Sequence, residues 1–225
     1  MKERREYALT QSQMGIYLDC QDRGDNSYCL PYLYEFDSHL DPVRLCRAAE
    51  TVIKAHPTLF TRIKTNDAGI PVQYIEEEPL TLTPEPLDGR DYRGLVKPFT
   101  LLGGRLFHVN ILQDNEHTYL FWECHHIIYD GSSLQVLLRH IAAAYNGEPV
   151  PQEPLTLTEV AEQEQALRAT EAYGEGKRWY AANFDCDDIS SSLMPDKERY
   201  KNSNDIGVIE RRLNIDLQAL ETYCH

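Results

Sequence analysis

Positive charge is scarce in this sequence. Its 225 residues hold 22 Lys and Arg against 36 Asp and Glu, which gives a formal net charge of −14. Binding to nucleic acid and attachment to an anionic membrane surface both need clustered cations. The composition therefore argues against both, and we expect neither a nucleic acid nor a membrane among the partners of the chain.

Long apolar runs are missing as well. No stretch approaches the roughly 20 consecutive apolar residues that a membrane-spanning helix needs. The first six residues, M-K-E-R-R-E, are charged and lack the apolar core of a signal peptide. We expect a soluble cytoplasmic protein.

Paired cysteines and nucleotide-binding motifs are also absent. Without a C-x-x-C pair a zinc site is not expected, and without an export signal the thiols should be reduced and mostly buried. The sequence has no P-loop, no G-x-G-x-x-G motif and no internal repeat. We expect no metal and no directly bound cofactor. The six cysteines are scattered: Cys20, Cys29, Cys46, Cys124, Cys186 and Cys224.

Several helix starts are marked by capping residues. Thr10-x-x-Gln13 and Thr156-x-x-Glu159 are capping boxes, and Asp41 before Pro42 is an N-cap. Ser132 or Ser133 is expected to cap a helix over 134–145. The first helix should bury Met14, Tyr17 and Leu18, and the second Val43, Cys46, Ala49, Val52 and Ile53.

Strand patterns lie between these helices. Residues 28–37 are rich in aromatic side chains and are expected to form a strand, and Pro31 indicates either an edge strand or a late start to its pairing. A hairpin turn at 114–116 joins the two best strand patterns. These two strands are expected at 106–112 and 118–128, and two shorter ones at 59–65 and 71–75.

The C-terminal part is more polar. Helical patterns cover 158–184, residues 186–205 are expected to form a loop, and a strand is predicted at 207–213. A last helix begins at Asp216 and reaches His225 without a capping glycine. We therefore expect the chain to be a fragment of a longer protein.

The most informative segment is C-H-H-I-I-Y-D-G-S-S, residues 124–133. Successive strand side chains point to opposite faces, so His125 and His126 do not both act on one metal ion or substrate atom. One should face the interior and the other a cleft. Asp130 and Gly131 follow at the end of the strand, where glycine lets a substrate approach the backbone. A neutral imidazole in this place suits acyl transfer to an amine or hydroxyl.

Other interpretations of this segment are weaker. The strand geometry argues against a metal site, and Cys124 lacks the positive neighbour that would activate a thiol for a dyad with His126. Ser132 and Ser133 lack the G-x-S-x-G turn of a nucleophile elbow. Two purely structural histidines remain the alternative.

Residues 125–131, H-H-I-I-Y-D-G, resemble the HHxxxDG motif of the condensation domains of non-ribosomal peptide synthetases, which have a chloramphenicol acetyltransferase-like fold. Three further segments resemble motifs of this family in the same order. They are L-T-Q-S-Q-M-G-I-Y at 9–17, A-H-P-T-L-F-T-R at 55–62 and P-F-T-L-L-G-G-R-L-F at 98–107. The resemblance covers most of the chain.

The resemblance implies an α/β fold, as an α+β two-layer sandwich with a central mixed sheet flanked by helices. Residues 1–185 would form the N-terminal lobe, and 186–225 the inter-lobe connection and the start of a truncated C-terminal lobe. The implied activity is amide-bond formation between a donor acyl or peptidyl thioester and the amine of an acceptor amino acid. Both substrates would be carried on phosphopantetheine arms of peptidyl carrier domains, beside an adenylation domain and the missing C-terminal lobe. By itself the fragment is expected to fold but to condense poorly.

The resemblance also assigns roles to residues. His126 matches the catalytic histidine, which helps the acceptor amine attack the thioester, and His125 matches a mainly structural position. Asp130 matches a carboxylate that pairs with an arginine, and Gly131 lines the substrate channel. The second motif departs from the pattern, with Phe60 in place of an arginine, so Arg62 is the expected partner of Asp130.

Four alternatives remain beside a condensation domain. An epimerisation domain would use the double histidine to move an α-proton, and a heterocyclisation domain would carry aspartates where the motif begins. A stand-alone acyltransferase of the same fold would take a free or CoA-bound acyl donor. A catalytically silent module would only dock a partner enzyme.

Overall fold

The computed structural model describes residues 4–23, 28–37, 39–87, 92–184 and 214–224. Its packing divides the chain into two units, Met1–Arg178 and Trp179–His225. The first unit holds the sheets and the segment with the two histidines. The predicted strand at 207–213, the predicted loop at 186–205 and Cys186 lie outside the described residues.

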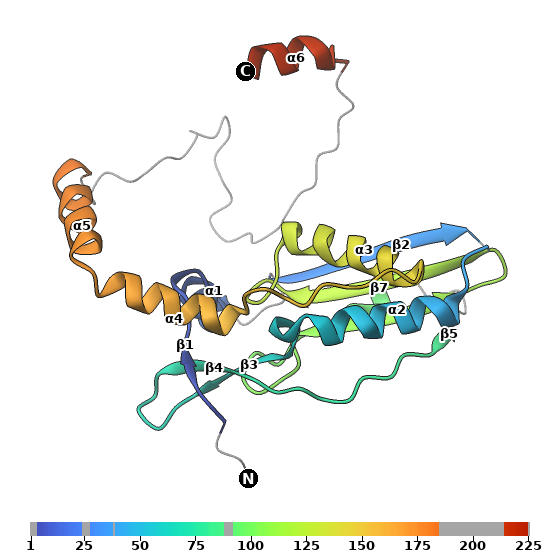
Figure 1. Cartoon of the computed structure of the whole chain (residues 1–225), viewed down its shortest axis with the longest axis horizontal. Helices are drawn as coiled ribbons and strands as arrows, with labels where there is room; N and C mark the ends of the chain where they lie inside the picture. Colours follow the sequence, from blue (N-terminus) through green and yellow to red (C-terminus); the bar gives the residue numbers. More distant parts are fainter. Residues whose placement is uncertain (1–3, 24–27, 38, 88–91, 185–213, 225) are drawn as a thin grey trace, which may run out of the picture. The chain divides into compact units, whose positions relative to one another are not determined.

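The larger sheet of the first unit has the strand order β2-β7-β6-β5 (Figure 1). Strand β5 runs parallel to β6, whereas β2 and β6 both pair antiparallel with β7, so the sheet is mixed as predicted. Pro31 lies in β2, and β2 is an edge strand as its proline indicated. The strands are β2 (Cys29–Asp37), β5 (Pro84–Pro86), β6 (Phe107–Gln113) and β7 (His117–His125).

A smaller antiparallel sheet has the order β1-β4-β3. A single bridge between Ile63 and Leu102 extends its β3 side. The expected strand at 59–65 begins later than predicted, because Pro57–Phe60 form a 3-10 turn, η1, before it. The strands are β1 (Tyr7–Ala8), β3 (Thr61–Thr65) and β4 (Pro71–Ile75).

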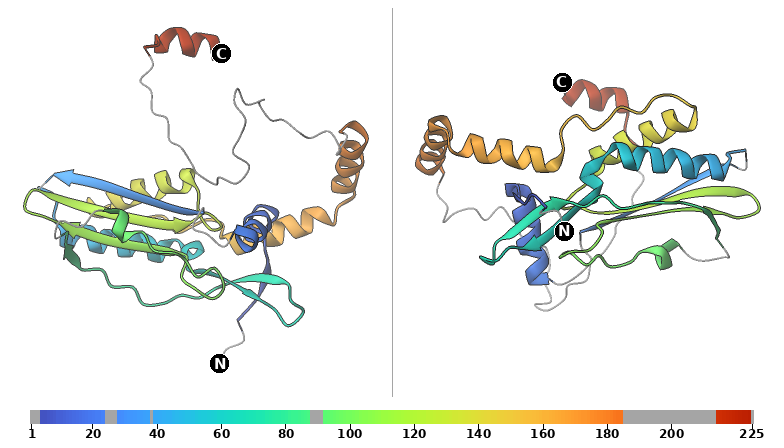
Figure 2. Two further views of the ribbon diagram at one scale, coloured as in Figure 1. Left: turned by 180° about the vertical axis from the view of Figure 1, so that it is seen from behind. Right: turned by 60° about the horizontal axis from the view of Figure 1, so that its bottom comes forward.

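Helices α2 (Pro42–Ala55) and α3 (Gly131–Tyr145) lie side by side over one face of the larger sheet (Figure 2). The Asp41 carboxylate caps α2 as predicted. The cap of α3 was predicted wrongly: it is Asp130, whose carboxylate accepts the Ser133 N–H, and not Ser132 or Ser133. Aspartate is among the best N-cap residues, and here it stands one position before the helix.

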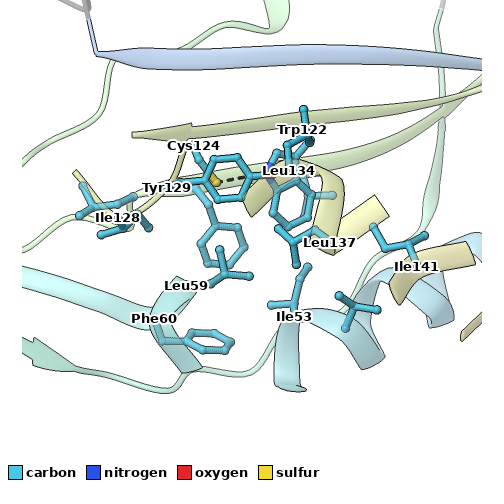
Figure 3. Packing of buried hydrophobic residues seen from close by; sticks show 14 of the residues in the cluster. Ile53, Leu59, Phe60, Trp122, Cys124, Ile128, Tyr129, Leu134, Leu137 and Ile141 are labelled. Atoms are coloured by element: carbon cyan, nitrogen blue, oxygen red, sulfur yellow. Dashed lines mark hydrogen bonds between the residues drawn. The ribbon is translucent and has the colours of Figure 1, made fainter. Parts of the chain in front are cut away.

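Strand β7 is buried on both faces, and its side chains alternate between two clusters. Leu120, Trp122 and Cys124 face α2 and α3 and join the main hydrophobic core (Figure 3). Tyr119 and Phe121 belong to a second cluster on the opposite face. By this alternation, His125 belongs to the face away from the two helices.

Helix α1 (Gln11–Arg23) begins with the predicted capping box, since Gln13 N–H donates to Thr10 Oγ1 and Thr10 N–H to Gln13 Oε1. The predicted stripes are wrong at two positions, because Leu18 and Val43 are exposed. The capping box at Thr156 and Glu159 is confirmed at the start of α4 (Leu157–Arg168). Gln11 N–H donates to the Glu164 carboxylate of α4 at 3.0 Å, which fixes α4 against α1.

The remaining helices are short or exposed. Helix η2 spans Tyr92–Leu95, and α5 (Glu171–Asn183) follows α4 and crosses the division between the units. In the second unit, the helix predicted from Asp216 is confirmed as α6 (Leu217–Cys224), with the Gln218 N–H donating to the Asp216 carboxylate. No helix among the described residues is long and apolar enough to cross a bilayer.

Candidate active site

The two histidines lie where β7 ends and the chain turns into α3. β7 stops at His125, so His126 is the first residue of the turn that precedes Asp130. The turn is attached to the residue just before the edge strand β2, because His126 N–H donates to the Tyr28 carbonyl at 2.8 Å. It closes on itself through a 3.1 Å bond from Ile128 N–H to the His125 carbonyl. His125 is buried and His126 is exposed, so one histidine faces the interior as predicted. The strand predicted over 118–128 is too long, however, and the turn rather than strand alternation directs His126 outward.

Both ring nitrogens of His125 have partners. Nδ1 accepts the Ile127 N–H at 3.1 Å, so this nitrogen carries no proton and the neutral ring is protonated at Nε2. Nε2 lies 3.8 Å from the Cys20 thiol. Burial, followed by the neighbouring His126, lowers the pKa of His125 to about 4. The His125 ring is thus neutral at pH 7 and its nitrogens are already engaged within the fold.

His126 opens onto a cavity of about 300 Å³, which we call the histidine cavity. The cavity lies between the turn, the first residues of α1 and the start of α4. Its lining is mixed: hydroxyl, amide and carboxylate groups stand beside aliphatic side chains. The residues that line it are Thr10, Ser12, Gln13, Ile16, His126, Ile127, Ile128, Tyr129, Asp130, Ser133 and Leu157.

Asp130 lies in the same cavity and is held rigidly by the helix that it caps. Its carboxylate accepts the Ser133 N–H at 2.7 Å and the Ser133 hydroxyl at 2.6 Å. These two bonds, and to a smaller extent the charge of His126, hold the pKa of Asp130 below its ordinary value. The site therefore keeps a negative charge near the His126 ring at neutral pH.

Gly131 is the first residue of α3, directly after the cap. A Cβ atom built on it meets nothing within 4 Å, so no neighbouring side chain or backbone requires a glycine here. The absence of a side chain leaves open space beside the turn.

The predicted pair of Arg62 and Asp130 is wrong. Arg62 is buried on β3 and donates from Nη2 to the Glu78 carboxylate and from Nη1 to the Thr61 carbonyl at 3.3 Å. Glu78 also accepts from Arg105 Nε at 2.7 Å. A carboxylate brought in by the chain between β4 and β5 therefore pairs with the arginine, and the Asp130 carboxylate is used by Ser133. Arg62 has a structural place outside the histidine cavity.

The structure also bears on the weaker interpretations. Cys124 is fully buried on the helix side of β7, accepts the Trp122 Nε1–H at 3.1 Å, and burial raises its pKa well above the usual range. A thiol in this state is not a nucleophile. Among the described residues, no three His, Cys, Asp or Glu side chains are placed to hold a metal ion.

Sequence reasoning treated Gln13 only as a capping residue, and the structure adds a second role. The Gln13 and Gln73 side-chain amides exchange two 3.0 Å hydrogen bonds in the interior. The Gln73 amide also donates to the Ala8 carbonyl at 3.0 Å. This network fixes the start of α1, which is one wall of the histidine cavity, to β4. The pairing could not be found in the sequence, because the two residues lie far apart in the chain.

The fold places this chain with known condensation domains. It superposes on the starter condensation domain of the rhizomide synthetase RzmA with a TM-score of 0.68 and 18% identity, over 80% of this chain and 48% of that one. The first condensation domain of the CDA synthetase gives a TM-score of 0.63 and 21% identity, over 81% of this chain and 50% of that one.

The sequence then identifies the family. The model of the condensation domain family matches residues 3–220, so the chain belongs to the condensation domain family. It is 30% identical over 179 residues to a plipastatin synthase of Bacillus subtilis (strain 168), which covers 76% of this chain and 5% of that protein. It is also 30% identical over 196 residues to tyrocidine synthase 3 of Brevibacillus parabrevis, covering 84% of this chain and 3% of that protein. The chain thus spans a small part of these synthetases and about half of the solved domains.

Proposed function

We propose that the chain is the N-terminal part of a condensation domain that forms an amide bond within a peptide synthetase. The bond joins a donor acyl or peptidyl thioester to the amine of an acceptor amino acid, and the donor's thiol leaves. Residues 1–185 are the N-terminal lobe in this proposal, and 186–225 are the connection to a second lobe. One observation supports the proposal above others: the exposed His126 shares a cavity with a fixed carboxylate, while both nitrogens of His125 are engaged elsewhere.

In this proposal His126 is the catalytic residue. Its imidazole takes the proton from the acceptor amine as the amine attacks the thioester carbonyl, or hydrogen-bonds the charge that develops there. The Asp130 carboxylate stabilises the imidazolium that results, because it stays ionised at neutral pH. His125 and Asp130 position the turn, and Gly131 leaves room for the substrate arm.

The proposed partners follow from the proposed reaction. Donor and acceptor peptidyl carrier domains bring the two substrates on phosphopantetheine arms, and an adenylation domain loads the acceptor. The cytoplasm is the proposed compartment, which agrees with the buried free thiols of Cys46 and Cys124. An epimerisation domain is the second candidate, since a histidine beside a carboxylate also suits removal of an α-proton.

The test uses the full-length parent protein with carrier-bound donor and acceptor aminoacyl thioesters in D2O. Intact mass spectrometry of the carriers compares wild type, His126→Ala and the matched control His39→Ala, which removes an exposed histidine from the turn before α2. We expect a carrier-bound dipeptide from wild type and His39→Ala, and a large loss in His126→Ala.

Other results would contradict the proposal. Deuterium at the α-carbon without a dipeptide would mean epimerisation. If wild type gives neither product, the carrier-dependent functions give way to a transferase that uses a free acyl donor or to a silent docking module. Equal losses in the two histidine variants would remove the special role of His126.

A further inference from the structure

A second cavity, of about 310 Å³, adjoins the histidine cavity and is called here the side cavity. The two cavities share Ile128, Tyr129 and Ser133 in their walls. A group bound in the side cavity therefore lies beside the turn that carries His126 and Asp130.

The wall of the side cavity is mostly aliphatic. Leu59, Ile128 and Leu137 line it from the main core (Figure 3). Val136 and Leu155 complete this wall and are each 38% exposed, so the cavity communicates with solvent. An aliphatic chain that enters the cavity removes these surfaces from water, which favours its binding.

One carboxylate interrupts this apolar wall. Glu153 is half-buried, and its position is fixed twice: its backbone N–H donates to the Ala55 carbonyl at 2.9 Å, and its Oε2 accepts the Thr58 N–H at 2.9 Å. Within the described part of the chain, no lysine, arginine or histidine forms an ion pair with Glu153. A fixed carboxylate in an apolar wall is stabilised by a cation brought close to it.

The histidine that lines the side cavity does not supply that cation. His56 Nε2 lies 2.9 Å from His140 Nδ1, so one proton serves the facing nitrogens of the two rings. Burial and the neighbouring His140 lower the pKa of His56, which keeps its ring neutral. The side cavity thus combines an aliphatic wall, a neutral imidazole and one unpaired negative charge.

We propose that the side cavity binds an aliphatic chain that ends in an ammonium group, with the ammonium on Glu153. The proposal rests on the proposed function for the source of this chain: the side chain of a basic amino acid that is delivered as a carrier-bound thioester. A neutral side chain of the same length would leave the Glu153 carboxylate without a counter-charge, so the charged chain is selected. A free alkylamine has the same chemistry, and the second experiment separates these two sources.

The first experiment needs no enzymatic activity. The chain is titrated with n-pentylammonium and with the neutral 1-pentanol, and NMR follows the leucine methyl and histidine ring signals of the side cavity. We expect wild type to bind pentylammonium about tenfold or more tightly than pentanol, because a hydrogen bond to a charged group changes an affinity by about tenfold. Equal binding of the two probes, or tighter binding of pentanol, overturns the proposal.

Three variants locate the effect. Glu153→Gln should abolish the preference for pentylammonium, and the matched control Glu175→Gln, an exposed position on α5, should retain it. Val136→Phe narrows the cavity from an exposed position and should weaken both probes. The spectrum of each variant shows that it is folded. A Glu153→Gln protein that keeps the preference contradicts the assignment.

The second experiment uses the full-length parent protein with lysyl and norleucyl thioesters, which differ by the ammonium group, in the donor and the acceptor position. We expect Glu153→Gln to slow condensation of the lysyl substrate in one position and to leave the norleucyl substrate unchanged. No condensation of either substrate, with pentylammonium still bound, means that the proposed function has failed and not the cation site. Condensation that shows no lysyl preference while pentylammonium binds assigns the cavity to a free amine and overturns the substrate assignment.

Discussion

Asp130 combines two roles that substitution can separate. Its carboxylate caps α3 through the Ser133 N–H and hydroxyl, and it places a negative charge near His126. Asp130→Ala removes both, whereas Asp130→Asn keeps an amide oxygen that caps the helix equally well. Loss of an N-cap costs about 1 kcal/mol, and the added bond to the Ser133 hydroxyl brings the expected cost of Asp130→Ala to about 1 to 2 kcal/mol. Asp130→Asn should lose only the charge interaction with the helix dipole, less than about 1 kcal/mol.

Thermal unfolding followed by circular dichroism measures the difference. For a chain of this size 1 kcal/mol shifts Tm by about 2 to 4 °C, so Asp130→Ala should unfold about 2 to 8 °C below wild type, and Asp130→Asn between the two. In the full-length protein, condensation should fall in both variants, because both lose the charge beside His126. The reasoning is refuted if Asp130→Ala unfolds at the wild-type temperature, or if Asp130→Asn condenses at the wild-type rate.

Three further predictions concern the surroundings of the site. Arg62→Ala should lower the free energy of unfolding by about 1 to 2 kcal/mol in urea titrations, because the buried guanidinium loses its bonds to Glu78 and to the Thr61 carbonyl while Glu78 keeps Arg105, yet the folded variant should condense normally. Gly131→Ala should raise the free energy of unfolding by about 0.5 kcal/mol, because a Cβ atom at this position meets nothing within 4 Å. The same methyl group should slow condensation by crowding the substrate arm. The pKa of His125, about 4 in the fold, lies below its ordinary 6.5, so the unfolded chain binds a proton first and stability should fall as pH drops from about 6.5 toward 4. Urea midpoints at pH 7.5 and pH 5 should differ less in His125→Gln than in wild type; an unchanged difference would contradict this.

Local signals in the sequence were sufficient for most elements. The two capping boxes and the Asp41 cap lie within four residues of the groups that they bind, so the sequence contains the whole interaction. The edge position of β2 agrees with Pro31, which has no backbone N–H to donate to a neighbouring strand. The contrast between a buried and an exposed histidine was expected from strand alternation, but β7 ends at His125 and the turn after it directs His126.

The errors have physical reasons. At the start of α3 three neighbouring residues are good caps, and the pattern of apolar residues does not tell which one stands just outside the helix. The partner of Arg62 depends on where the chain after β4 returns, which brings Glu78 to β3. Leu18 and Val43 fit a helical stripe, but the boundary of the stripe depends on which neighbours pack there, so both are exposed. The hydrogen bonds between Gln13 and Gln73, and those of Glu153 with Thr58 and Ala55, are likewise contacts between distant parts of the chain.

Helix α4 connects the histidine cavity with the part of the chain that follows. Its first residue, Leu157, lines the cavity and donates its N–H to the Thr58 hydroxyl at 3.0 Å, and about two turns later Glu164 accepts the first amide of α1. Helix α4 ends at Arg168, the Thr170 hydroxyl donates to the Leu167 carbonyl, and α5 begins at Glu171. A displacement of α4 would therefore act on the cavity wall and on the start of α1 together.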